Sequence, residues 1–257
     1  MRLVLTLRST RASPYDLCYH HNLQAFVYSL IRRAGYFDLH DRPGCKFFCF
    51  SNLIPPGRRI DAGSKKTLVV SSPDSEMIAS LRDEAKRMDK GEIKIGGMAF
   101  RLERSKTVET GIPEGFGEFT LDSGTPIVVR IPRYRLKEYG ITPARDYDYV
   151  YWRKEHTPTP FIKQLEENLV KKFNEYSGTV TDETPIFEKV KFVKQVAVPL
   201  RMQERETTVI GTLWEFDFQA LDGQRRSLLE FGFEAGLGEM NSMGFGFMNV
   251  HDPAACR

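Results

Sequence analysis

Residues 66–91, KTLVVSSPDSEMIASLRDEAKRMDKG, contain a sharp change of predicted secondary structure. Lys66–Ser71 is apolar and rich in β-branched side chains, which predicts a strand. Ser72 is a favourable N-cap, Pro73 suits the first helical position, and acidic residues occupy the first turn. We therefore expect a strand followed directly by a helix that ends at Gly91.

The segments on either side complete an order of elements that is known from small domains. Upstream, we expect a strand at Arg2–Leu7, a helix at His21–Ala34 and an aromatic-rich strand at 45–53. Downstream, Ile93–Arg104 is expected to return as a strand. The order strand, helix, strand, strand, helix, strand is that of a ferredoxin-like domain, an antiparallel sheet with both helices on one face.

The second half of the chain follows a stretch rich in glycine and proline, and we expect the domain boundary there, dividing 1–113 from 114–257. The elements predicted after it are strands near 117–122, 125–131 and 147–152, a helix at 161–176, a hairpin of 189–198 with 207–218, a helix at 223–233 and a strand near 245–250. This order predicts a second domain of similar style. The expected fold is α+β, with two tandem ferredoxin-like (RRM-like) domains.

Composition restricts the class of protein. The 257 residues, 41% hydrophobic and 28% charged, suit two ordinary globular domains. A net charge of only +3 leaves any RNA-binding surface to local clusters of cations. The four cysteines lack the spacing of a disulfide or zinc framework. Because neither a signal peptide nor an apolar run of roughly 18 residues is recognised, we expect a cytoplasmic protein.

Four glycines near the C-terminus form the most distinctive motif, Gly236-Leu-Gly238-Glu-Met-Asn-Ser-Met-Gly244-Phe-Gly246. A helix C-cap followed by a bulged hairpin explains one or two of these glycines, but hardly four. The motif has neither the strand and helix of a dinucleotide-binding fingerprint nor the Lys-Ser/Thr ending of a P-loop. The remaining interpretations are a backbone cradle whose N–H groups face nucleic-acid phosphates, or a structural brace beneath one.

The first predicted helix and the segment after it carry side chains that handle protons and phosphate charge. Tyr28 lies opposite the apolar stripe of this helix, on a solvent-facing strip with His21 and Arg32. A surface tyrosine beside a helix-end arginine is the plain alternative. His40 follows in a polar loop, and Lys46 interrupts an aromatic strand. Such breaks in a local pattern often mark functional sites.

The glycine pattern, within GFEAGLGEMNSMGFGF, resembles the signature loop of the RAMP superfamily of CRISPR proteins, specifically of its repeat-processing endoribonucleases. The tandem layout and chain length are similar too, so the resemblance covers essentially the whole chain. In that family the active site combines a tyrosine on the first helix, a histidine in the next loop and a lysine six residues beyond it. Tyr28, His40 and Lys46 match this set in order. The resemblance therefore implies that these residues are catalytic, in an endoribonuclease that cuts CRISPR precursor transcripts within the repeat.

These residue types suit a cleavage that needs neither metal nor cofactor. In it the RNA's own 2′-hydroxyl attacks the adjacent phosphorus, leaving a 5′-hydroxyl and a 2′,3′-cyclic phosphate. His40 can give or take a proton at neutral pH, and Lys46 can stabilise charge on the phosphoryl oxygens. Tyr28, with a reference pKa of about 10, can orient the 2′-hydroxyl or act as an acid. The assignment of base and acid between Tyr28 and His40 stays open.

The expected partner is CRISPR repeat RNA, held by the four glycines together with His21 and Arg32. The resemblance also allows contacts with other subunits of a CRISPR effector complex, and either a monomer or a homodimer. The alternative is a non-catalytic RAMP subunit that binds guide RNA in such a complex, but it has no use for Tyr28, His40 and Lys46. A messenger-RNA binder fits less well, because no strand shows the RNP aromatic pattern.

Overall fold

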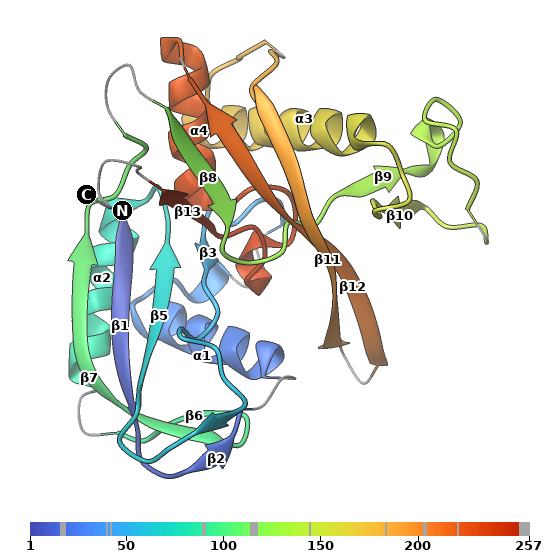
Figure 1. The fold of residues 1–257 in the computed structure, drawn as a ribbon. Coiled ribbons are helices and arrows are strands. Elements are labelled where there is room, and N and C mark those ends of the chain that lie inside the picture. The colour runs from blue at the N-terminus through green and yellow to red at the C-terminus, as the bar shows by residue number, and fades with distance from the viewer. Residues whose placement is uncertain are drawn as a thin grey trace.

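The computed structural model describes residues 1–251 with the exception of 16–18, 40, 42, 89–90, 114–117, 144, 183, 203–204 and 220. Two large hydrophobic clusters organise these residues. The first gathers buried side chains from Leu3 to Leu102, and the second gathers those from Ile112 to Met248. Each cluster lies between an antiparallel sheet and a pair of helices, so the α+β layout expected from the sequence is observed (Figure 1).

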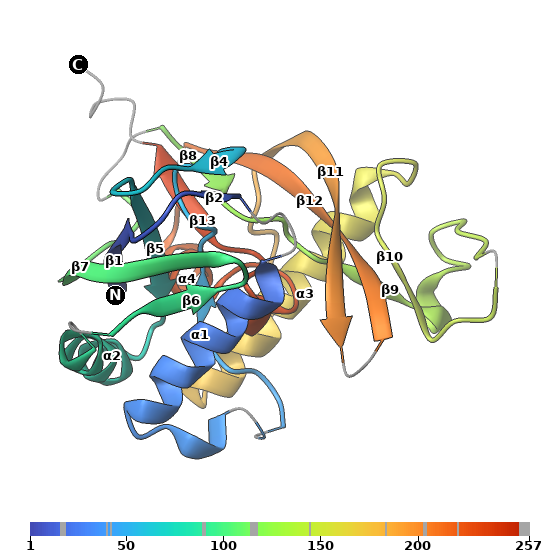
Figure 2. The same ribbon diagram turned by 90° about the horizontal axis from the view of Figure 1, so that it is seen from below.

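The N-terminal domain is built on a five-stranded antiparallel sheet with the order β3-β5-β1-β7-β6. Its elements are β1 (Arg2–Ser9), β2 (Ser13–Pro14), α1 (His20–Arg33), η1 (Phe37–Leu39), β3 (Cys49–Phe50), β4 (Arg59–Ile60), β5 (Lys65–Ser71), α2 (Ser75–Arg87), β6 (Ile93–Ile95) and β7 (Met98–Val108). Leu3, Leu5 and Leu7 alternate along the central strand and are fully buried. Figure 2 shows α1 and α2 together on the face that these leucines define.

Helix α2 begins two residues later than the sequence predicts, at Ser75 and not at Pro73. Its N-cap is Asp74, whose carboxylate accepts a hydrogen bond of 2.8 Å from the backbone N–H of Met77. Ser72 lies two residues earlier, and its hydroxyl accepts a hydrogen bond of 3.1 Å from the backbone N–H of Asp74. The prediction of Ser72 as the N-cap was therefore wrong, since the carboxylate of Asp74 takes that position.

Two of the predicted strands are shorter than expected. The segment 45–53 is extended and paired only at Cys49–Phe50, because Phe47 adopts a left-handed φ of 43° that interrupts the strand. Lys46 therefore does not share a strand face with its aromatic neighbours. The segment 93–104 divides into β6 and β7, since Gly96 takes a φ of 60° and closes a turn between them.

The C-terminal domain is built on a four-stranded antiparallel sheet with the order β11-β12-β8-β13. Its elements are β8 (Phe119–Ser123), β9 (Arg130–Pro132), η2 (Arg133–Arg135), β10 (Tyr149–Tyr151), α3 (Pro158–Ser177), β11 (Lys189–Met202), β12 (Arg205–Phe218), α4 (Gly223–Ala235), η3 (Asn241–Met243) and β13 (Met248–His251). Helices α3 and α4 contact each other beside the sheet. The hairpin β11–β12 extends far beyond the sheet, and β9–β10 forms a separate ribbon on the right of Figure 1.

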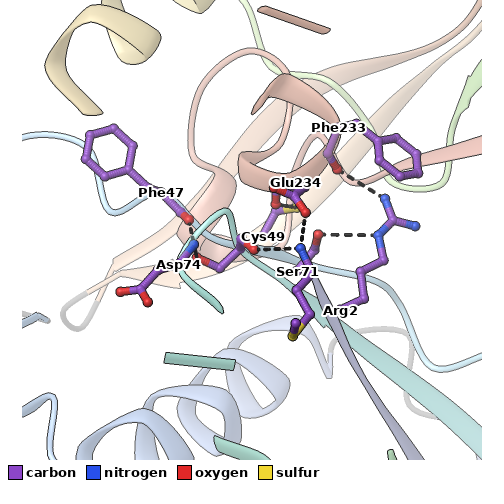
Figure 3. A network of polar contacts seen from close by, with 9 residues as sticks. Arg2, Phe47, Cys49, Ser71, Asp74, Phe233 and Glu234 are labelled. Carbon is purple, nitrogen blue, oxygen red and sulfur yellow. Dashed lines mark hydrogen bonds and ion pairs between the residues drawn. The ribbon is translucent and has the colours of Figure 1, made fainter. Parts of the chain in front are cut away.

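Arg2 joins the two domains. Its guanidinium is buried, donates to the backbone oxygens of Phe233 at 3.1 Å and Met248 at 2.7 Å, and packs 3.8 Å from the centre of the Phe233 ring. Burial lowers the pKa of Arg2 to about 10. Figure 3 shows this arginine beside Glu234, whose backbone oxygen contacts the thiol of Cys49. The central strand of one domain is thus bonded directly to α4 and β13 of the other.

None of the helices that the structure describes is long and apolar enough to cross a membrane. The predicted boundary at residues 113/114 stays a prediction, because 114–117 lie outside the described ranges.

Candidate active site between the domains

Tyr28 projects from α1 toward the C-terminal domain. The buried side chains of this helix recur at helical spacing, and Tyr28 lies beside that stripe with its ring edge-on to Phe48, 5.7 Å between centroids. Its hydroxyl is hydrogen-bonded to Ser242 of the glycine loop, here defined as residues 236–246. The expected solvent-facing position was wrong, since the ring is half-buried. Burial raises the pKa of Tyr28, so the phenol keeps its proton at neutral pH.

Lys46 lies close to Tyr28, with its ammonium 5.8 Å from the centre of the tyrosine ring. Both the lysine and the glycine loop line a pocket of about 350 Å³, which we call the interdomain pocket. One wall consists of residues 44–48 from the N-terminal domain. The other consists of residues 238–242 together with Arg130, Asn168 and Lys172. The pocket thus gathers cations from both domains, and the phenol of Tyr28 lies beside it, next to Lys46.

Backbone strain is concentrated at the same pocket. Among the described residues, Phe47 and Met240 are the two non-glycine residues with a positive φ, at 43° and 60°. Phe47 belongs to the first wall of the interdomain pocket and Met240 to the second. Strained residues of this kind persist where the surrounding structure holds them, and they cluster at functional sites. Their coincidence marks the pocket as the candidate active site.

His40 lies outside the described residues. Its neighbour Asp41 lines a second pocket, of about 610 Å³, together with Tyr28 and Arg32. Arg32 is exposed in the last turn of α1, and His21 is exposed in the first. The structure therefore brings together Tyr28, Lys46 and the glycine loop. Arg32 lines the second pocket with Tyr28, and His21 is exposed in the first turn of α1 without lining either pocket.

The four glycines of the loop have φ values from 68° to 92°, and each is tightly surrounded. A Cβ on Gly246 would lie 1.9 Å from the backbone oxygen of Leu237, and one on Gly244 would lie 2.6 Å from the ring of Phe50. No other residue type fits both the backbone and the space. The motif is therefore explained by close packing as well as by its turns.

The N–H groups of this loop point largely inward. Those of Gly236, Gly244 and Gly246 donate to backbone oxygens of the protein, at distances from 2.8 to 2.9 Å. Three of the four glycine N–H groups are thus already bonded. This geometry favours the structural brace over the backbone cradle, the two interpretations that the sequence leaves open.

In the sequence the basic pair Lys171-Lys172 is typical of a solvated face, but Lys172 is buried and fastens the loop to α3. Its buried ammonium donates to the backbone oxygens of Gly236 at 2.7 Å and Gly238 at 2.9 Å, and to Oδ1 of Asn241 at 2.9 Å. Burial lowers the pKa of Lys172 to about 8. A signal was present, because Lys172 continues the helical spacing of the buried Leu165 and Leu169.

His20 is a second buried group that joins the loop to α1. Its Nε2 lies within hydrogen-bonding distance of the backbone oxygen of Met243, and its ring packs 5.0 Å from that of Phe245. Burial lowers the pKa of His20, so the neutral ring donates its Nε2–H to the carbonyl. In the sequence His20 stands three residues before Leu23 on the buried stripe, which was the available signal.

The interdomain pocket combines the half-buried Lys46 with a rigid loop, and the protonated phenol of Tyr28 lies beside it. Arg130 contributes a further cation, although it is paired with the carboxylate of Glu239. Such a set can hold an anionic phosphate and supply a hydrogen-bond donor to it. In the described part of the chain, no group of three or more His, Cys, Asp or Glu side chains could hold a metal ion.

Comparisons with known proteins agree in one family. The model described as "CRISPR associated protein Cas6, C-terminal" matches residues 113–250. The CRISPR-associated endoribonuclease Cas6 of Haloferax mediterranei is 30% identical, covering 97% of this chain and 93% of the relative. CRISPR-associated endoribonuclease Cas6 2 of Methanocaldococcus jannaschii is 28% identical, covering 97% and 99%.

Solved structures show the same fold. A "CRISPR associated protein Cas6" aligns with a TM-score of 0.71 at 22% identity, covering 98% of this chain and 99% of the other. "An RAMP protein binding different RNA substrates" aligns with a TM-score of 0.73 at 18% identity, covering 98% and 100%. At these identities the likeness concerns the fold alone, and it confirms the tandem ferredoxin-like prediction.

Proposed function

The chain belongs to the Cas6 family of CRISPR-associated endoribonucleases, and we propose that it cuts precursor CRISPR transcripts within the repeat at the interdomain pocket. The observation that carries this location is the meeting of Tyr28 and Lys46 with the glycine loop. The two residues come from a helix and an irregular segment of one domain, and the loop comes from the other. The RNA is therefore cut where the two domains meet.

The proposed reaction is an internal transfer of the phosphoryl group. The 2′-hydroxyl loses its proton and attacks the adjacent phosphorus, while the bond to the 5′-oxygen of the next nucleotide breaks and that oxygen takes up a proton. The products are a 2′,3′-cyclic phosphate and a 5′-hydroxyl. Water is not consumed, and no metal ion is required for the proton transfers.

The three side chains divide this work. Lys46 stabilises the negative charge that grows on the phosphoryl oxygens. His40, whose ordinary pKa lies near neutrality, transfers a proton. Tyr28 is held protonated by burial, so it donates a hydrogen bond or a proton and does not serve as the base. The base would then be His40.

The remaining predicted RNA contacts receive different roles. Arg32 lies beside Tyr28 in the second pocket and would bind a neighbouring phosphate. His21 would extend the same surface along α1. Gly236, Gly238, Gly244 and Gly246 act mainly by holding the loop, and the RNA would lie against its outer surface. We further propose that the chain divides into domains 1–113 and 114–257, and that no cofactor takes part.

The non-catalytic alternative, a subunit that only holds guide RNA, would not need the close approach of Lys46 to Tyr28. The test is a gel assay with end-labelled repeat RNA in EDTA, comparing the natural substrate with one that carries a 2′-deoxy nucleotide at the cut. We expect one cut in the natural RNA and none in the deoxy RNA. Tight binding with no cut in either would overturn the proposal, and a cut abolished by EDTA would overturn its metal independence.

A further inference from the structure

A concave site larger than the interdomain pocket lies elsewhere, in the C-terminal domain. It has a volume of about 730 Å³ and lies between the loop that leads into β10 and the extended half of the β11–β12 hairpin. Tyr147, Tyr149 and Tyr151 form one side of it, and Thr207 and Thr208 form part of the other. We call this site the tyrosine pocket.

The aromatic side chains of this pocket are unusually open. Tyr147 is 50% exposed and Tyr149 is 38% exposed, whereas the two tryptophans of the domain are almost fully buried. Tyr151 is half-buried, with its ring edge-on to that of Tyr149 at 5.6 Å. Grouped tyrosines with free ring surface are a typical platform for unpaired bases, because every base presents a π-face.

The polar groups indicate a nucleoside and not a bare phosphate. Arg153 supplies an exposed cation, but the carboxylate of Asp148 lines the same pocket and would repel a free anion. Nδ1 of His156 accepts a hydrogen bond of 3.2 Å from the backbone N–H of Arg153, so the neutral ring carries its proton on Nε2. Donors and an acceptor around aromatic rings match the mixed edge of a nucleobase.

Arg130 connects this pocket to the proposed site of cleavage. Its guanidinium lies 4.7 Å from the centre of the Tyr149 ring and pairs with Glu239 of the glycine loop. Both Arg130 and Glu239 line the interdomain pocket. A strand of RNA that crosses Arg130 therefore passes from one pocket to the other without leaving the protein surface.

The wall behind the tyrosines is shared with the glycine loop. Tyr151 packs against a small buried cluster that includes Val128, Val209 and Phe245, with Met240 and Met243 at its margin. The cluster joins the β11–β12 hairpin to the loop that carries Ser242. The tyrosine pocket is thus built on the same support as the interdomain pocket.

We propose that the tyrosine pocket binds one unpaired nucleotide of the repeat RNA, whose base stacks on Tyr147, the more exposed ring, while the scissile phosphate occupies the interdomain pocket. This inference rests on the proposed function, because the nucleotide belongs to the RNA that is cut. It adds a subsite that reads an unpaired position at a distance from the cut.

The test combines a matched pair of tyrosines with a base-specific probe. Tyr147→Ala removes a ring from the pocket, whereas Tyr134→Ala removes a ring that is 80% exposed on η2 and does not line it. In single-turnover cleavage we expect Tyr147→Ala to raise the half-saturating protein concentration by roughly 5- to 100-fold, with the maximal rate unchanged. Tyr134→Ala should match wild type, and Tyr147→Phe should restore binding.

A set of repeat RNAs, each with 2-aminopurine at one position, identifies the nucleotide by fluorescence quenching on binding. We expect one position at which quenching is lost in Tyr147→Ala and kept in Tyr134→Ala. Equal behaviour of the two variants in binding and quenching would overturn the subsite while leaving the cleavage proposal intact. Absence of cleavage by wild type would overturn the proposed function instead, and the quenching experiment would still decide whether the pocket holds a base.

Discussion

On the N-terminal side of the interdomain pocket, Tyr28 is half-buried and Lys46 lies on an irregular segment that ends at the strained Phe47. On the C-terminal side, the glycine loop is bonded from within by the buried Lys172 and by the side chain of Asn241, which donates to the backbone oxygens of Leu237 and Phe245. The first wall thus carries Lys46 on a segment without regular secondary structure. The second presents few reactive groups on a backbone that is held at many points.

If the catalytic roles are as proposed, this difference means that the reacting side chains belong to one domain and the loop that positions them belongs to the other. A change on the first wall should alter the rate of cleavage while the protein stays as stable as before. A change on the second should lower the free energy of unfolding, and any loss of rate should follow from that, except at Ser242, which contacts Tyr28 directly. The separation can be tested one residue at a time.

The largest effect is expected at His40. Replacing it in His40→Ala removes the proposed proton-transfer group, so the single-turnover rate should fall by about 10²- to 10⁴-fold. The affinity for repeat RNA and the midpoint of urea unfolding should remain those of wild type. A rate that falls by less than about threefold would remove His40 from the mechanism.

Lys172→Met should have the next largest effect, and on stability. The substitution leaves three acceptors of the loop without their buried donor, which we expect to lower the free energy of unfolding by about 3–5 kcal/mol. Lys171→Met is the matched control, because the neighbouring lysine is exposed on the same helix and should change stability by about 0.5 kcal/mol at most. If Lys172→Met abolished cleavage with stability unchanged, the separation by domain would fail.

Gly246→Ala and Gly178→Ala compare the loop with an ordinary helix end. Both glycines have a φ of 70°, but a Cβ on Gly178 meets nothing within 4 Å, whereas one on Gly246 meets backbone. We expect Gly178→Ala to cost about 1 kcal/mol from backbone strain alone, and Gly246→Ala to cost about 2–4 kcal/mol because the loop must also move. Urea unfolding measures both, and equal losses would show that the loop is not closely packed.

The pH dependence of stability tests the charge on Lys172. Its pKa falls from 10.5 to about 8 on folding. Below that pH both states hold the proton and folding carries the cost of burying it, whereas at higher pH the folded chain releases a proton that the unfolded chain keeps. The stability that this residue contributes therefore rises with pH.

From about pH 7.5 to 9.5, the free energy of unfolding of wild type relative to Lys172→Met should rise by about 2 kcal/mol. Comparing the two proteins at each pH removes the titration of every other group that they share. A difference that stays level or falls would contradict the buried ammonium.

The smallest expected effect concerns the contact between the two walls. Ser242→Ala removes the hydrogen bond to the Tyr28 hydroxyl, and a bond of this kind should change the cleavage rate by about 2- to 10-fold. Ser242→Thr should recover most of the rate because it keeps the hydroxyl. Ser227→Ala, which removes an exposed hydroxyl bonded within α4, is the control and should cleave like wild type.

Much of the fold could be predicted from the sequence, since its signals are local. The alternating leucines of β1 and the acidic first turn of α2 specify their elements without reference to distant residues. The break at Phe47 could not be predicted, because nothing in the sequence distinguishes a left-handed phenylalanine from a strand residue. Its φ depends on contacts such as the edge-on packing of its ring against Tyr176 and Phe231, from the other domain.

The residues of the candidate site also fall into two groups, those predicted from the sequence and those whose role depends on distant contacts. Tyr28 and Lys46 were identified by residue type and order, and the structure brings them together. The roles of Lys172 and His20 could not be assigned from the sequence, because a buried cation or imidazole becomes meaningful only through its acceptors. Those acceptors lie in the glycine loop, more than sixty residues from Lys172 and more than two hundred from His20.

Arg2 has a consequence for synthesis of the protein. Its bond to Met248 spans 246 positions of sequence, so the two residues are synthesised far apart in time. The N-terminal sheet can form early. Arg2, at the start of its central strand, gains its backbone acceptors only after α4 and β13 have been made. Nascent chains that have not yet reached residue 236 would thus carry Tyr28 and Lys46 without the glycine loop opposite. We therefore expect the candidate site to form only after the C-terminal domain has been made, and partial chains that lack it to be inactive.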